Sequence, residues 1–457
     1  MSERKERTCG HLRGTFAGHQ VCKHLLDLEH PDFLRYRPGL KSAPTNEDFS
    51  YRLACIACAH ELETGKDILW FDICNLCFLQ RDIAGVCRGH IGLPAILERS
   101  TNLQFAHHVY DLPHQHSVLT VTTLMNHPSA RWVAIDQSGH VLLINPGVSS
   151  QVLTDHQTVL RALGDDVRVH ASSDGRFVVV VQHHGSNGIV LDLHQNTCVM
   201  ELNRGEYHTE QTEFPVALLQ RQERSLLIHA TNWNRLDVTD LTNGLPLTQR
   251  SFPESTTPEE QPAHYLDFFH GALRVSPSGE WIADDGWVWA PVGVVTAWNL
   301  ETWLGNNVWE SEDGASKKSL IWHHYHWDVP MCWLNNAEIA IWGIGDDDYW
   351  IAPGVNIVDV RTGETIRQFF GPEVREAPKI TQSTKRIRPN LVFDQYLFAL
   401  IPGCSLSVWD VITGEKFFAD HSWGPLAYHP EDQVFWSAAE SGQFRLSHLV
   451  SPDVEIT

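Results

Sequence analysis

The stretch SLSVWDVITG (405–414) shows the pattern that decides the fold of this chain. Apolar residues alternate along it, an Asp follows them, and a Thr-Gly turn ends it. Alternation with period two is typical of a β-strand, because successive side chains point to opposite faces of a sheet. The same phrase recurs as GHVLLINPG (139–147), GIVLDLHQN (188–196), NRLDVTDLTNG (234–244), GVVTAWNLET (293–302), GVNIVDVRTG (354–363) and, in degenerate form, GQFRLSHLV (442–450).

The spacing of these copies indicates a β-propeller. When the copies are aligned on their acidic or amide position, the residues at that position are Asn145, Asp192, Asp240, Asn299, Asp359, Asp410 and His448. Successive residues of this set are 47, 48, 59, 60, 51 and 38 positions apart. Periods of this size with strand-like alternation are typical of four-stranded blades and exclude helical solenoids. Seven copies therefore predict an all-β, seven-bladed β-propeller over residues 101–457.

The phrase x-Trp/Val-Asp-x-x-Thr-Gly resembles the WD-repeat family, most clearly at Trp409-Asp410 with Thr413-Gly414. The resemblance covers about residues 105–450 and implies a propeller ring, but no activity. The family's Gly-His dipeptide is absent from most copies, and the fourth and fifth carry insertions. The family closes its ring by pairing a strand from one terminus into the blade of the other. We expect residues 103–112 (LQFAHHVYDL) to supply that outermost strand, because only nine residues follow His448.

The first ninety residues hold seven of the ten cysteines and predict a structural zinc module over residues 1–100. The core of the pattern is Cys55-x-x-Cys58 and Cys74-x-x-Cys77, with fifteen residues between the pairs. Each C-x-x-C turn points two thiolates at one ion, and the segment between them is long enough to fold back. Disulfides are disfavoured because the polar start of the chain lacks a secretory apolar region. A small α+β module held by one or two Zn²⁺ ions is the simplest interpretation.

Eleven candidate ligands in this segment exceed the needs of one ion: Cys9, His11, Cys22, His24, Cys55, Cys58, His60, Cys74, Cys77, Cys87 and His90. The natural partition for two ions gives the first Cys55, Cys58, Cys74 and Cys77, and the second Cys22, His24, Cys87 and His90. An interleaved, cross-braced pairing has the same support, because spacing alone does not separate the two. A cross-braced module would resemble RING-type or ubiquitin-binding fingers, although the C-x-H pairs fit neither order well.

The charge distribution argues against nucleic acid as a partner. Residues 1–100 hold thirteen basic and thirteen acidic residues, so the remaining residues carry the whole net charge of −22. An acidic body repels phosphate backbones. No apolar run reaches the roughly 20 residues of a membrane span, so we expect no membrane contact. Reduced cysteines without an export signal favour the cytoplasm.

Residues 281–350 are the strongest candidates for a binding surface, since they hold eleven of the seventeen tryptophans. Several of these are expected to pack between blades, and Trp298 is the clearest case. The acidic run Asp346-Asp347-Asp348 with Trp350 predicts an exposed loop that contacts a partner. Tryptophan offers a large contact area at low entropic cost, and carboxylates select a basic or polyhydroxylated ligand.

An enzyme is the alternative interpretation. A metal-dependent hydrolase near the propeller axis, similar to the propeller lactonases, would use Asp284, His323 and Asp347. These candidates cluster in two blades, and a ring of four ligands is missing from the sequence pattern. The pairs His107-His108, His183-His184 and His323-His324 are expected to be strand residues that point to opposite faces. Neither a G-x-S-x-G elbow nor a phosphate-binding loop occurs.

The sequence therefore favours a non-catalytic interaction or scaffold protein. Its propeller loops would bind a protein or peptide partner, and the zinc module would supply structure or a second contact. Propellers serve both binding proteins and enzymes, so the fold alone does not decide between them.

Overall fold

The computed structural model divides the chain into two compact units, residues Met1–Leu97 and Glu98–Thr457. It describes four short strands before residue 74, and then residues 97–99, 101, 103–113, 117–251, 262–289, 291–344, 351–372 and 389–450. Among these residues no helix has the length and apolar character that a membrane crossing requires.

The first unit contains a four-stranded sheet. Its strands are β1 (His19–Cys22), β2 (Phe33–Tyr36), β3 (Arg52–Cys55) and β4 (Trp70–Ile73), in the order β2-β3-β1-β4. Strand β1 runs parallel to β3 and antiparallel to β4. The predicted helical part of this module lies outside the described residues, and so do the side chains of the predicted zinc ligands.

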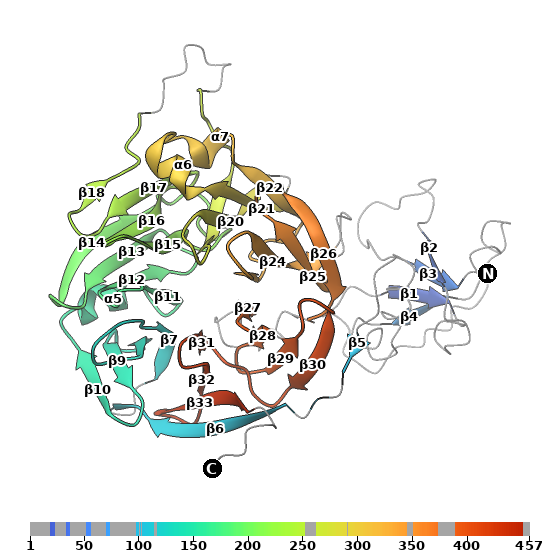
Figure 1. Cartoon of the computed structure of the whole chain (residues 1–457), viewed down its shortest axis with the longest axis horizontal. Helices are drawn as coiled ribbons and strands as arrows, with labels where there is room; N and C mark the ends of the chain where they lie inside the picture. The colour runs from blue at the N-terminus through green and yellow to red at the C-terminus, as the bar shows by residue number, and fades with distance from the viewer. Residues whose placement is uncertain are drawn as a thin grey trace. The chain divides into compact units, whose positions relative to one another are not determined.

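The second unit is the predicted seven-bladed propeller, seen along its axis in Figure 1. Blades one to three are β7 (Val118–Thr123), β8 (Trp132–Asp136), β9 (Val141–Asn145) and β10 (Ser149–Leu153); β11 (Val167–Ala171), β12 (Phe177–Gln182), β13 (Asn187–Asp192) and β14 (Thr197–Asn203); and β15 (Val216–Arg221), β16 (Arg224–Asn232), β17 (Arg235–Asp240) and β18 (Leu245–Pro246). A short helix, α5 (Gln157–Ala162), connects the first two blades.

Blades four to seven complete the ring. They are β19 (Phe269–Val275), β20 (Trp281–Val288), β21 (Val292–Asn299) and β22 (Lys318–His324); β23 (Met331–Trp333), β24 (Glu338–Ile344), β25 (Ala352–Asp359) and β26 (Glu364–Phe370); β27 (Asn390–Phe393), β28 (Leu397–Ile401), β29 (Ser405–Trp409) and β30 (Glu415–Asp420), with β5 (Leu97–Glu98) at its edge; and β31 (Ala427–His429), β32 (Val434–Ala438), β33 (Gln443–Val450) and β6 (Gln104–Asp111). The extra length of the fourth repeat forms α6 (Leu300–Gly305) and α7 (Glu310–Asp313).

Each copy of the repeated phrase forms the third strand of a blade, from β9 to β33. In five copies the aligned Asp or Asn side chain accepts a backbone N–H of the turn that follows. The Asp192 carboxylate accepts the backbone N–H of His194 at 2.9 Å, and Asp240 accepts that of Thr242 at 2.9 Å. In the fourth copy Asn299 accepts the N–H of Thr302 at 2.9 Å and thereby caps α6. Short acceptor side chains stabilise such turns, which explains why this position recurs.

The middle strands of a blade are apolar on both faces because each blade packs between two others. In β12, Val178 and Val180 belong to the apolar cluster shared with blade one. Their neighbours Phe177, Val179 and Val181 belong to the cluster shared with blade three. Successive side chains of a strand point to opposite faces, so one apolar run supplies two interblade cores.

The ring closes as the sequence predicts. Strand β6 pairs antiparallel with β33, from Asp111 opposite Gln443 to Gln104 opposite Val450. The Phe105 ring lies 5.4 Å from Trp423 and 5.9 Å from Phe435, so the strand also adds side chains to the core. A segment from the start of the propeller thus completes its last blade.

A pair of truncations tests this closure. A chain that lacks residues 1–115 loses β6 and is expected to unfold or aggregate, because β33 then exposes an unpaired edge. A chain that lacks residues 1–95 keeps β6 and should retain the thermal midpoint of the propeller. Calorimetry and gel filtration measure both, and equal thermal stability of the two chains would contradict the assignment.

Candidate functional site

Most of the sequence-predicted site residues lie outside the described part of the chain. This holds for Asp346, Asp347, Asp348 and Trp350, and for six of the eight predicted zinc ligands. The other two, Cys22 and Cys55, are the last residues of β1 and β3. These strands are adjacent and parallel, so the two cysteines lie at the same end of the sheet. The zinc site and its ligand pairing remain predictions.

The tryptophans of residues 281–350 divide into packing and surface residues. Trp281, Trp287 and Trp298 are buried on β20 and β21, as expected for blade packing, and Trp303 is buried on α6. Trp289 and Trp322 are 46% and 51% exposed. Large exposed aromatic rings are the more informative observation, since they mark candidate binding surfaces.

Trp289 belongs to an aromatic platform on one side of the ring. In an antiparallel blade, the turn between the second and third strands lies on the same side as the connection to the next blade. Residues from such turns and connections in blades three and four meet here. We define the aromatic platform as Tyr207, His208, Trp233 and Trp289 at the surface, with Phe269 and Trp287 beneath them.

The rings of the platform contact one another directly. The Trp233 ring lies 4.4 Å from Phe269, and Trp289 lies 4.7 Å from Trp287 between ring centroids. Tyr207, 49% exposed, lies 5.3 Å from Trp233. Since Phe269 and Trp287 are almost fully buried, they fix the exposed rings from below.

Exposed carboxylates surround the platform. Glu206 and Glu210 flank Tyr207 and His208 along the chain, and Asp267 precedes the strand that carries Phe269. Burial raises the pKa of the Tyr265 hydroxyl, and the charge of Asp267 raises it further. The surface around the rings is therefore electronegative, which favours a cationic partner.

The proposed hydrolase residues are separated in the part of the chain that the structure describes. Asp284 is buried on β20, where it accepts from the N–H of Gly271 at 3.0 Å and lies 2.6 Å from His270 Nδ1. His323 Nε2 lies 3.1 Å from the carbonyl oxygen of Gly343. Asp284 lies opposite Thr296 of β21, and His323 lies opposite Gly293 of the same strand. Asp284 and His323 are therefore about three residues, or roughly 10 Å, apart in the direction of β21. Asp347 is outside the described residues.

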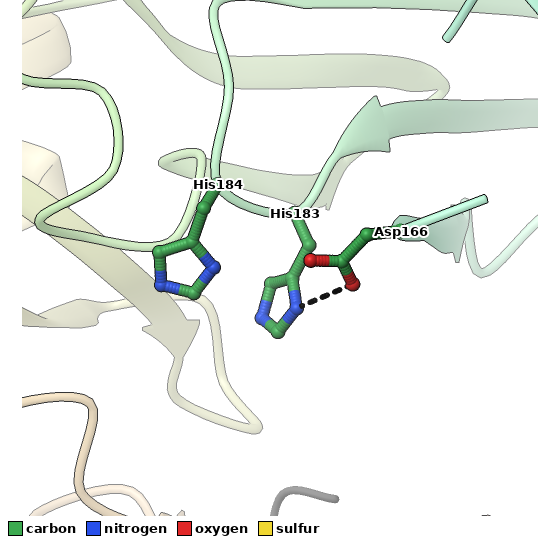
Figure 2. Close-up of side chains that lie close together, drawn as sticks. All are labelled: Asp166, His183 and His184. Carbon is green, nitrogen blue, oxygen red and sulfur yellow. Dashed lines mark ion pairs between the residues drawn. The ribbon is translucent and has the colours of Figure 1, made fainter. Parts of the chain in front are cut away.

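A different group of ionisable side chains does come together, and the sequence analysis missed it. Asp166, His183 and His184 each offer a ligand atom within 4.8 Å of the others, as Figure 2 shows. The expectation that His183 and His184 point to opposite faces of a strand is wrong, because both follow β12 in its turn to β13, with ring centroids 4.6 Å apart. The following Gly-Ser-Asn-Gly (185–188) is a turn signal that could have located them.

Asp285 is a buried acid close to this group. Its Oδ2 accepts the backbone N–H of Val329 at 2.6 Å, whereas its Oδ1 has no hydrogen-bond partner among the described residues. Burial raises the pKa of Asp285 well above its usual value, and the nearby Asp328 carboxylate adds to the effect. The folded protein therefore holds this carboxyl protonated in a pH range where an exposed Asp is ionised.

Comparison with known proteins gives no family assignment: no family model matches the chain, and no curated protein matches it. The fold defines the class of this protein, a seven-bladed β-propeller.

The Asp285→Asn variant tests the buried acid. A carboxyl whose pKa is raised by folding contributes stability that is complete below its unfolded pKa of 3.8 and is lost progressively as pH rises toward the folded pKa. The amide in the variant does not ionise, so the variant does not lose stability in this way as pH rises. Its free energy of unfolding relative to that of the wild type should therefore increase from about pH 5 to about pH 8. Urea unfolding at both pH values measures the difference. Asp267→Asn, at an exposed site, is the control and should show little change; parallel curves for Asp285→Asn and the wild type would refute the assignment.

Proposed function

We propose that this protein is a non-catalytic interaction protein whose propeller binds a basic segment of a protein partner on the aromatic platform. The observation that carries the proposal is the exposure of Trp289 and Tyr207 on a buried aromatic base. Exposure of large apolar rings to water is unfavourable, so a cluster of them at the surface marks an interaction site.

The chemistry of the surface selects the class of partner. Arginine and lysine bind the faces of Trp and Tyr rings through cation–π contact, worth about 0.5–1 kcal/mol at exposed sites and more when water is excluded. Glu206, Glu210 and Asp267 supply negative charge beside the rings. A partner segment with Arg or Lys next to apolar residues satisfies both features, and the net charge of −22 speeds its association.

The rigidity of the platform favours affinity. Phe269 and Trp287 belong to β19 and β20, which are held by the hydrogen bonds of blade four. The exposed rings therefore lose little conformational freedom when a partner binds. This support also limits adaptation, so we expect recognition of a short motif rather than a wide, variable surface.

The Trp289→Ala variant tests the platform. A random peptide library selected on the full-length protein should yield sequences enriched in Arg and Lys, with affinity that falls as salt rises. Trp289→Ala should weaken the selected peptides by about 2 kcal/mol, or roughly 30-fold, because central aromatic residues dominate interfaces. Trp322→Ala is the matched control: Trp322 is equally exposed but lies on the outer strand β22, and its removal should leave affinity unchanged.

Two results would contradict this function. Peptides without basic residues would remove the assigned partner class, and equal binding by the wild type and Trp289→Ala would remove the platform. Fluorescence anisotropy with labelled peptides measures both, and thermal unfolding confirms that each variant is folded.

We also propose that the first unit holds structural zinc. The support is the spacing of the paired cysteines at 55/58 and 74/77, together with the small size of the unit. Metal analysis of the full chain should find zinc, and Cys74→Ala should lower the amount and destabilise residues 1–100 to proteolysis. The proposal fails if a zinc-replete preparation contains none.

A further inference from the structure

We propose that Asp166, His183 and His184 bind a divalent transition-metal ion at the inner end of blade two. Two imidazoles and one carboxylate are a ligand set typical of Zn²⁺, Co²⁺ and related ions, whereas Ca²⁺ and Mg²⁺ require oxygen ligands. All three residues belong to the second unit, and none of them is part of the aromatic platform.

The geometry needs only a small adjustment to hold an ion. His183 lies between the other two side chains, with its Nδ1 3.4 Å from Asp166 Oδ1 (Figure 2). Ligands at ~2.0–2.1 Å from a tetrahedral ion lie about 3.4 Å from one another. The three ligand atoms already fall within 4.8 Å of one another, so no separation between them must shorten by more than about 1.4 Å. Rotation of the Asp166 side chain, which is 55% exposed, can supply much of this movement.

His183 is a buried imidazole with an unsatisfied nitrogen. Its side chain is 3% exposed, and its Nε2 lies 2.9 Å from Glu213 Oε1. That contact is outside hydrogen-bond geometry, so Nε2 lacks a hydrogen-bond partner in the described structure. A buried polar atom without a partner is costly. The Glu213 carboxylate lies beside Nε2 and Asp166 beside Nδ1, so Nδ1 is the nitrogen of His183 that faces the proposed ion.

The backbone of His183 fixes its position. Its N–H donates to the carbonyl oxygen of Asp166 at 2.8 Å, and its carbonyl oxygen accepts the N–H of Phe214 at 2.8 Å. One ligand is thus hydrogen-bonded directly to another, and the turn is attached to the chain that enters blade three. A site on a rigid backbone holds its ligands at defined distances, as a metal centre requires.

Asp328 acts as a positioning residue for His184. Its Oδ2 lies 3.0 Å from His184 Nε2, although the two residues are 144 positions apart in sequence. Asp328 adopts a positive φ of 55°, which is uncommon outside glycine and marks a constrained site. A carboxylate that accepts from one imidazole nitrogen orients the ring and leaves the other nitrogen available for a metal.

Arg204 holds the loops that surround the site. Its guanidinium is almost fully buried and donates to the carbonyl oxygens of Gly185, Thr209, Thr212 and Glu213 at 2.8–3.1 Å. Burial lowers the pKa of Arg204 to about 10. Because its donors are used on these backbone atoms, Arg204 braces the His183–His184 turn against the Glu213 segment.

An open cavity gives access to the site. The cavity has a volume of about 630 Å³, and Asp166, Arg168 and His183 are among the residues that line it. An ion bound by three protein ligands keeps positions open for water. The cavity supplies room for that water and a path for the ion.

Metal binding by the full-length protein tests the site. Equilibrium dialysis against Zn²⁺, Co²⁺, Mg²⁺ and Ca²⁺ should show one more Zn²⁺ or Co²⁺ per chain in the wild type than in Asp166→Asn or His184→Gln. The cysteines contribute equally to all three proteins, so the difference isolates this site. Asp328→Asn should lower the affinity of the extra ion by about 10–100-fold. The matched control is His108→Gln, in the exposed His pair of β6, which should bind as the wild type does.

The outcomes separate the proposal from its alternatives. Equal Zn²⁺ and Co²⁺ content in the wild type, Asp166→Asn and His184→Gln would overturn it. Preference for Ca²⁺ or Mg²⁺ would also overturn it, because it indicates acidic surface binding rather than imidazole ligands. The cobalt absorption spectrum gives an independent readout, since loss of one nitrogen or oxygen ligand in either variant changes the contribution of this site, while a cysteine-bound ion keeps its spectrum. Circular dichroism confirms the fold of each variant.

Discussion

The packing of each blade between two others is the constraint on which the structure depends. A four-stranded sheet with two apolar faces is not stable alone, because both faces must be removed from water. In β12, alternate residues such as Val178 and Val179 belong to different interblade cores. Every blade therefore needs both neighbours, and the β6–β33 pairing gives the last blade its missing edge. Stability resides in the closed ring rather than in any one sheet.

A closed ring leaves the connections between strands free to vary in sequence, and both candidate sites lie in these connections. The described candidate sites lie on one side of the ring, in second-to-third turns and in connections between blades. Their side chains are held by the strands that flank them, as Phe269 on β19 supports Trp289. Surface residues on a rigid scaffold are pre-organised for binding, and loops can change without loss of the core.

The fold was predictable from sequence because one period of alternation was repeated seven times. The acidic position of each copy was visible for the same local reason, since a short side chain caps the following turn. The ring closure followed from the short tail after His448. The Asp166, His183 and His184 group was not predictable by the same logic. Two of its members are adjacent, but Asp328 joins them from 144 residues away, and only the closed ring brings these segments together.

The connection between blades four and five links the two candidate sites. Trp327 lies 5.8 Å from Trp287 of the platform, and its indole N–H donates to the carbonyl oxygen of Gln211 at 2.6 Å. The next residue, Asp328, contacts His184. Since adjacent residues share a backbone, a bound ion that restricted Asp328 through His184 would also restrict Trp327, whose ring contacts Trp287 of the platform. Any resulting change in affinity for a partner segment must be matched by the same factor in affinity for the ion, because coupling between two binding sites is reciprocal.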